Sequence, residues 1–213
     1  MSAGNPLVVA GHETGEMELD DSVLWARSAG GDTGAFGLLF ERHAKAIYNY
    51  CFRRVGDWSA AEDLLSIVFL EAWRRRDKQL PPGKVLPWLY GIATNVVRNR
   101  RRSERRYRAA LARVPAAEHA LDVAEEAVDR ADDERHLRGA LDLLAKLPRR
   151  QQDVFVLCAW SGLSYEDAAF ALGVPVGTVR SRLARARQAL RELDRPEGHE
   201  RGEVPHTEEK AEG

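Results

Sequence analysis

The apolar residues of this 213-residue chain recur with the period of an α-helix, and no stretch alternates in the way that a strand requires. The clearest apolar stripe consists of Phe36, Leu39, Phe40, His43, Ile47, Tyr50 and Cys51. Hydrophobic residues make up 44% of the chain and charged residues 31%, a balance typical of modest cores with a large solvated surface. The sequence therefore predicts an all-α protein.

Breaks in the helical pattern divide the chain into two small helical domains and three polar segments. The pattern covers residues 19–108 and residues 135–194. The two ends, residues 1–18 and 195–213, are rich in Gly and Glu, which predicts disordered tails. Residues 109–134 separate the two helical domains.

The separating segment is strongly acidic towards its end. Residues 118–134 contain eight acidic side chains and one Arg, a net charge of −7. Because like charges at this density oppose compaction, we expect residues 109–134 to form a flexible acidic linker. A solvated helix face is the alternative for its second half.

Local signals place the helix starts of the first domain. Gly31-Asp32-Thr33 marks the start of the helix that carries the apolar stripe. Ser59-Ala60-Ala61-Glu62 has the pattern of a capping box, which predicts that Ser59 caps the next helix. After a loop with Pro81-Pro82-Gly83, a long helix is expected over residues 86–108.

The second domain ends in two helices joined by a tight turn. Ser164 and Asp167 form a capping box, and Gly173-Val174-Pro175 is the turn. The last helix, expected over residues 176–191, contains five Arg and no acid, which suits the major groove of duplex DNA in a helix-turn-helix. The candidate DNA contacts on it are Thr178, Arg180, Ser181, Arg182, Ala184, Arg185 and Gln188. The alternative is an ordinary surface helix with solvated arginines.

The long helix of the first domain has a second basic face. Residues 98–108 contain seven Arg and one Glu, a net charge of +6. Arg contacts phosphates, Asn bonds base edges and an aromatic ring supports an unstacked base, a combination that suits melting DNA. The candidate residues are Trp88, Asn95, Arg98, Asn99 and Arg102. The alternative is a solvated face with Trp88 in the core.

No sequence feature indicates an enzyme, a metal site or a membrane segment. The chain lacks a Gly-rich phosphate loop, a nucleophile elbow and Cys/His metal spacing. Cys51, Cys158 and His43 lie on apolar helical stripes, which predicts packed core residues. No apolar run approaches the ~20 residues of a membrane span, and the start lacks a signal-peptide pattern. We expect a cytoplasmic protein with no cofactor, small-molecule substrate or membrane contact.

Taken together, residues 20–193 resemble the extracytoplasmic-function (ECF) sigma factors of bacterial RNA polymerase. In the first domain the resemblance rests on Gly31-Asp32 with Ala35-Phe36, Ala61-Glu62-Asp63-Leu64 with Phe69 and Trp73, and Trp88-Leu89-Tyr90-Gly91-Ile92-Ala93-Thr94-Asn95. In the second it rests on Leu147-Pro148, Gly162-Leu163-Ser164-Tyr165-Glu166-Asp167-Ala168-Ala169 and Gly177-Thr178-Val179-Arg180-Ser181-Arg182-Leu183. The chain departs from the family pattern at Ser66 and Ile67, where the family usually has Gln and often Glu.

The resemblance implies a non-enzymatic subunit that binds core RNA polymerase and promoter DNA. The first domain would be sigma region 2, with the loop 79–87, Asn95 and Asn99 holding a flipped base of the melted −10 element. The second would be sigma region 4, which reads the −35 element as duplex and contacts the beta flap. An anti-sigma factor is a further candidate partner. Docking on the clamp helices of the largest polymerase subunit would involve Glu62, Asp63, Leu64, Phe69 and Trp73.

A stand-alone helix-turn-helix regulator, with a sensor or dimerisation module as its first domain, is the competing interpretation. It explains the second domain equally well. It does not explain the Arg/Asn face of the first domain or the acidic linker.

Overall fold

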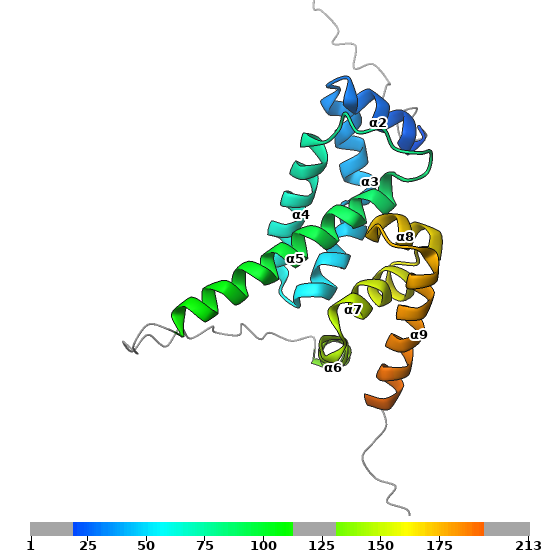
Figure 1. Cartoon of the computed structure of the whole chain (residues 1–213). Coiled ribbons are helices and arrows are strands. Elements are labelled where there is room, and N and C mark those ends of the chain that lie inside the picture. The colour runs from blue at the N-terminus through cyan, green and yellow to red at the C-terminus, as the bar shows by residue number, and fades with distance from the viewer. Residues whose placement is uncertain (1–18, 113–130, 194–213) are drawn as a thin grey trace, which may run out of the picture.

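The computed structural model describes residues 19–112 and 131–193, which form helices and no strand (Figure 1). The expected all-α class is confirmed. The expected tails and most of the expected linker lie outside the described residues. Among the helices of the described residues, none is both long enough and apolar enough to cross a membrane.

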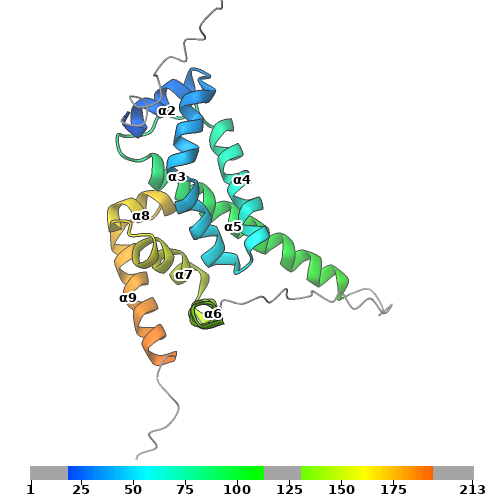
Figure 2. The same ribbon diagram turned by 180° about the vertical axis from the view of Figure 1, so that it is seen from behind.

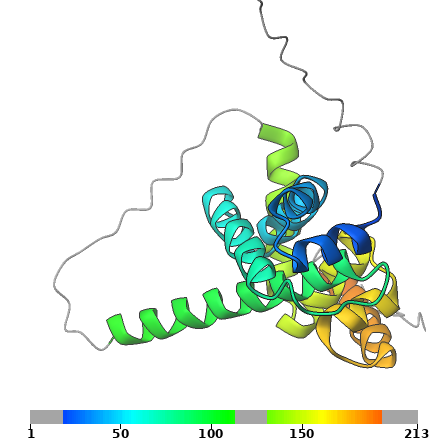
Figure 3. The same cartoon turned by 90° about the horizontal axis from the view of Figure 1, so that it is seen from above.

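The first domain is built from α2 (Asp21–Ala29), α3 (Thr33–Val55), α4 (Trp58–Arg74) and α5 (Val85–Leu111). α3, α4 and α5 pack on one another, and α2 packs across one end of α3 (Figure 1, Figure 2). The C-terminal half of α5 extends well beyond the other helices, as Figure 3 shows from above. The arginine-rich part of α5 is therefore carried on a projecting helix.

The apolar stripe predicted on α3 forms the core of this domain. Leu39, Ile47, Tyr50 and Cys51 are at most 1% exposed, whereas Phe40 of the same stripe is 40% exposed. His43 is buried, and its Nε2 lies 2.7 Å from Oδ2 of Asp21 in α2. The stripe thus holds α2, α3 and α5 together, with Phe40 left at the surface.

One helix start differs from the sequence prediction. Asp32 caps α3 by accepting a hydrogen bond from the Ala35 amide at 3.0 Å, as expected for a start at Thr33. The cap of α4 is Asp57, whose carboxylate accepts from the Ala60 amide at 2.5 Å. The prediction that Ser59 caps this helix is wrong, because Ser59 already lies in its first turn.

The second domain consists of α6 (Ala131–Lys146), α7 (Arg149–Phe155), the π-helical turn η1 (Val156–Trp160), α8 (Tyr165–Leu172) and α9 (Val176–Leu193). The predicted helix-turn-helix is present. Ser164 Oγ accepts from the Asp167 amide at 3.0 Å, and Gly173 adopts a φ of 63° between α8 and α9. Because α6 begins at residue 131, the last residues of the expected linker are helical.

The two domains pack against each other, which the sequence did not predict. α8 lies along α5, and η1 touches α3 (Figure 1, Figure 2). Where α5 meets α8, a Cβ on Gly91 would stand 2.6 Å from the carbonyl oxygen of Ala171. A side chain at this position would force the two helices apart, so glycine is required for the observed packing.

Candidate nucleic-acid interface

α9 turns an apolar side to its own domain and a polar side to solvent. The residues that anchor it, each at most 1% exposed, are Val179, Leu183 and Ala186. The exposed residues of the opposite side, named the α9 face below, are Arg180, Ser181, Ala184, Arg185 and Gln188. Thr178 and Arg182, also predicted to face DNA, are half-buried at its edges.

Contacts within the α9 face are local and solvent-exposed. The Arg180 guanidinium lies 5.8 Å from the centre of the Tyr165 ring. Gln188 donates from Nε2 to Oε1 of Glu192 at 3.0 Å. Exposed contacts of this kind contribute little to stability, so DNA can replace them at small cost.

Asn95, Asn99 and Arg102 are exposed along one side of α5. Two of them border a groove of about 520 Å³ between α4 and α5. The groove is lined by Leu64, Ile67, Glu71, Arg75, Ile92, Asn95, Val96, Asn99, Arg100, Ser103 and Arg106. Amide, guanidinium and apolar groups in one groove are the components that bind an unpaired base and its phosphate.

Trp88 is not part of this exposed side. Its side chain is 7% exposed and packs edge-on against Trp25, with ring centres 4.8 Å apart. Trp25 Nε1 donates to the Lys78 carbonyl at 2.9 Å, and Lys78 Nζ lies 5.8 Å from the Trp88 ring. In this structure Trp88 is therefore a core residue that supports the loop before α5, as in the alternative given by the sequence.

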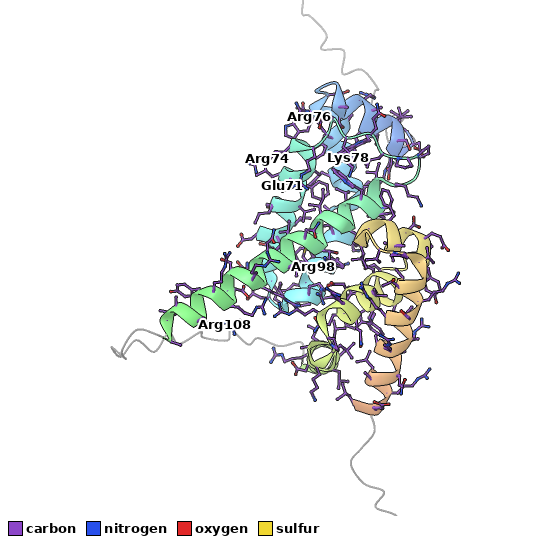
Figure 4. All side chains as sticks on the ribbon, in the orientation of Figure 1. Glu71, Arg74, Arg76, Lys78, Arg98 and Arg108 are labelled. Atoms are coloured by element: carbon purple, nitrogen blue, oxygen red, sulfur yellow. The ribbon has the colours of Figure 1, made fainter. Side chains whose placement is uncertain are left out.

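Arg98 of α5 reaches towards the second domain (Figure 4). Its Nε and Nη2 both donate to Oδ2 of Asp153 in α7, at 3.1 and 2.7 Å. The structure therefore does not bring all the predicted −10 residues together, because Arg98 is engaged by the other domain.

The end of α4 adds basic residues that the sequence patterns did not reveal (Figure 4). Arg74 and Arg75 pair with Glu71 at 3.0 and 2.7 Å, and Arg76 lies over the Trp73 ring at 4.3 Å. Lys78 follows in the loop. The run of three arginines in the sequence is the signal that could have indicated this patch.

The residues expected to dock on polymerase divide into surface and core groups. Glu62 and Asp63 are exposed on α4, and Trp73 is half-buried. Leu64 and Phe69 are 1% and 5% exposed, so in this structure they lie in the core beneath the exposed side of α4.

The surface of α4 also exposes apolar residues that the sequence patterns did not assign to docking. Trp58 at its start is 53% exposed, and Ile67 and Leu70 in its second half are 45% and 48% exposed. Phe40 of α3 is also exposed and packs against Phe69, with ring centres 4.8 Å apart. Apolar positions that lie off the buried stripe of an amphipathic helix are the signal that could have identified them.

Both cysteines are free thiols whose surroundings disfavour the thiolate. Burial raises the pKa of Cys51 to about 12 and also raises the pKa of the half-buried Cys158. Across residues 19–112 and 138–193, no three His, Cys, Asp or Glu side chains are grouped as a metal site requires.

Two family models match the chain, one over each helical domain. Residues 39–107 match sigma-70 region 2, and residues 137–190 match sigma-70 region 4. These spans correspond to α3–α5 and to most of α6–α9.

Several sigma factors are similar to the chain in sequence. It is 34% identical over 165 residues to RNA polymerase sigma factor CarQ of Myxococcus xanthus, covering 76% of this chain and 91% of CarQ. It is 30% identical over 195 residues to the ECF RNA polymerase sigma-E factor of Haemophilus influenzae, covering 84% and 97%.

Solved structures show the same architecture. CnrH in complex with the cytosolic domain of CnrY matches with a TM-score of 0.62 and 28% identity, covering 81% of this chain and 96% of CnrH. The sigma factor RpoE in complex with the anti-sigma factor NepR from Bartonella quintana matches with a TM-score of 0.58 and 27% identity, covering 75% and 98%. The chain therefore belongs to the ECF sigma factors, the non-enzymatic sigma-70 subunits of transcription initiation.

Proposed function

We propose that this sigma factor binds core RNA polymerase in the cytoplasm and selects promoters by reading the −35 element as duplex and the −10 element as melted DNA. The observation that carries the proposal is the α9 face, an exposed and acid-free surface on the second helix of a helix-turn-helix. A helix of this kind fits the major groove.

In region 4, the small residues Ser181 and Ala184 allow α9 to lie deep in the groove. Arg180 and Arg185 can then fork onto guanine acceptors or phosphates. Thr178, Arg182 and Gln188 flank these contacts.

In region 2, the groove between α4 and α5 would receive the unpaired strand. Asn95 and Asn99 present amides to base edges, while Arg102 contacts the backbone. Residues 79–87, which form the loop before α5 and the start of that helix, would capture a flipped base. Unstacking a base costs a few kcal/mol, which several arginine contacts and one base pocket can offset.

Core polymerase would be bound through both domains. On α4, Glu62, Asp63, Trp73, Ile67 and Leu70 form the surface proposed for the clamp helices. In the second domain, an apolar groove of about 270 Å³ is proposed for the beta flap, and it is lined by Ala140, Leu143, Leu144, Phe155, Trp160, Leu190 and Arg191.

An anti-sigma factor is proposed as a further partner. The similar solved structure of RpoE contains the anti-sigma factor NepR, and that of CnrH contains the cytosolic domain of CnrY. A partner of this type would compete with polymerase for the same exposed apolar residues of α4.

Run-off transcription on fragmented genomic DNA tests the proposed function. Core RNA polymerase is assayed with and without this protein, and the start sites of new transcripts are mapped. Defined transcripts that require the protein, with two shared upstream elements, support the proposal. If no transcript appears and a pull-down retains no core polymerase, the stand-alone regulator becomes the better account.

A further inference from the structure

A buried group of charged side chains joins the two domains. Arg54 of α3 places Nη2 at 2.5 Å from Oδ1 of Asp153, while Arg98 of α5 donates to Oδ2 of the same carboxylate at 2.7 Å. The side chains of Arg54 and Asp153 are each 1% exposed. Both oxygens of one buried carboxylate in region 4 are thus held by arginines of region 2.

Gln152 extends this contact to a third arginine. Its Oε1 accepts from Arg54 Nη1 at 2.7 Å and from Arg101 Nη1 at 3.1 Å. Its Nε2 donates to the carbonyls of Ala145 and Leu147 in its own domain. We call Arg54, Arg98, Arg101, Gln152 and Asp153 the interdomain arginine cluster.

Positive charge exceeds negative charge in this cluster. The cluster contains three guanidinium groups and one carboxylate, that of Asp153, which pairs with Arg54 and Arg98. Burial, followed by the neighbouring Arg54 and Arg149, lowers the pKa of Arg101 to about 10. Arg54 Nε is buried without a hydrogen-bond partner in the described part of the chain. Since unpaired buried charge is strongly destabilising, the closed arrangement depends on Asp153.

Of the two arginines held by Asp153, Arg98 belongs to the basic stretch of α5, and Arg101 of the same stretch is held by the neighbouring Gln152. Arg98 and Arg101 lie in residues 98–108, whose net charge is +6. Guanidinium groups bind carboxylate and phosphate with the same forked geometry. Asp153 therefore occupies a place that a DNA phosphate would take if region 4 moved away.

We propose that Asp153 is an internal phosphate mimic that keeps the free chain closed and competes with the DNA backbone for Arg54 and Arg98. The inference rests on the proposed function, since it treats α5 as a DNA-binding helix. When a phosphate replaces Asp153, the cluster loses its only carboxylate and α7 is released from α5. Engagement of α5 by DNA and separation of the two domains are then one event.

Two measurements on the full chain without polymerase test this proposal. One is the radius of gyration from small-angle X-ray scattering, and the other is the affinity for a fluorescent single-stranded oligo(dT) 20-mer. Asp153→Asn keeps the shape of the side chain but removes its charge. We expect an expanded scattering profile and about tenfold tighter oligo(dT) binding. This change in affinity corresponds to a wild-type chain whose closed form is about ten times as populated as its open form.

Asp142→Asn is the matched control, because it removes the same charge from an exposed position on α6. It should leave the profile compact and change the affinity little. Gly91→Ala opens the same interface by steric contact with Ala171 and should also expand the chain. If Asp153→Asn is folded by circular dichroism but matches Asp142→Asn in both readouts, the proposal is overturned.

The wild-type chain provides a test that does not depend on the folding of any variant. Saturation with oligo(dT) should expand its scattering profile, because phosphate displaces Asp153. Binding with an unchanged compact profile would refute the competition. Neither result decides promoter selection, which run-off transcription measures separately, so failure of this inference and failure of the proposed function are distinguishable.

Discussion

Lys84 Nζ, at the residue before α5, lies 2.6 Å from Oδ1 of Asp167 in the first turn of α8, so an ion pair ties the loop before α5 to the helix-turn-helix. The two side chains are 30% and 29% exposed. Burial by itself would raise the pKa of Asp167, but hydrogen bonds from Lys84 and Ser164 bring the pKa below its usual 3.8.

This lowered pKa predicts how the contribution of Asp167 depends on pH. A carboxylate with a depressed folded pKa adds stability that is complete above its unfolded pKa and is lost as the pH falls through the folded pKa. We expect the difference in unfolding free energy between wild type and Asp167→Asn to stay constant from about pH 7 to pH 5. It should shrink below about pH 4, as measured by urea titrations.

Lys84→Met serves as the control for this titration. It removes the partner but leaves the Ser164 hydrogen bonds, so its own difference from wild type should be smaller than that of Asp167→Asn. A difference for Asp167→Asn that persists unchanged to pH 3 would contradict the assigned direction of the pKa shift.

The cap of α4 predicts a contrast between two neighbouring residues. Asp57 accepts from the Ala60 amide, whereas Ser59 lies in the first turn. Asp57→Ala should lower the free energy of unfolding by about 1 kcal/mol, and Ser59→Ala by much less. Chemical denaturation of both variants checks the order; a larger loss for Ser59→Ala would restore the capping box read from the sequence.

This pair also shows what the sequence could and could not predict. Ser164 and Gly173 were predictable because a cap and a positive-φ turn depend on residues within one helical turn. Asp57 and Ser59 are both good caps, and the choice between them depends on where α4 packs against α3. Tertiary packing decides which of the two residues caps the helix, and the local sequence pattern holds no information about that packing.

The contact between the domains lay further beyond the sequence. Asp153 is one acid in an amphipathic helix, and Gly91 is one glycine in a buried motif. Their roles depend on Arg98 and Ala171, which lie 55 and 80 positions away along the chain. Periodicity identifies which side of each helix is buried, but it does not tell which domain covers it. Trp88 illustrates the same limit, since its aromatic ring suits either a core or a base platform.

Arg185 in the α9 face predicts a sequence-dependent defect. If its guanidinium forks onto a guanine, Arg185→Ala should weaken the binding free energy for the preferred −35 duplex by about 1–3 kcal/mol. The loss should be much smaller for a duplex in which that guanine is replaced by another base. Fluorescence anisotropy with a panel of single-base variants measures this. Arg138→Ala, exposed on α6, is the control; an equal loss on every duplex would make Arg185 a phosphate contact.

The exposed apolar residues of α4 predict a loss of polymerase binding without a loss of folding. Ile67→Asp or Leu70→Asp places a charge where we propose that the clamp helices pack. Each should weaken core polymerase binding by about tenfold or more, because charge at an apolar contact must be desolvated. Val23→Asp alters a residue on α2 that is 45% exposed and should bind normally. Equal binding by all three variants would place the docking surface elsewhere.

Asn95 predicts a defect in strand opening that is separable from duplex binding. Its amide is exposed beside the groove between α4 and α5, where an unpaired base would be held. Asn95→Ala should lower the permanganate reactivity of promoter thymines several-fold while holoenzyme binding to the closed promoter changes little, because a base edge becomes available only after unpairing. Asn49→Ala, half-buried on α3, controls for the substitution itself. Unaltered thymine reactivity in Asn95→Ala would remove Asn95 from the −10 site, whereas a parallel loss of closed-complex binding would make it a duplex contact. Only a selective loss of reactivity fits a residue that traps bases after they unstack.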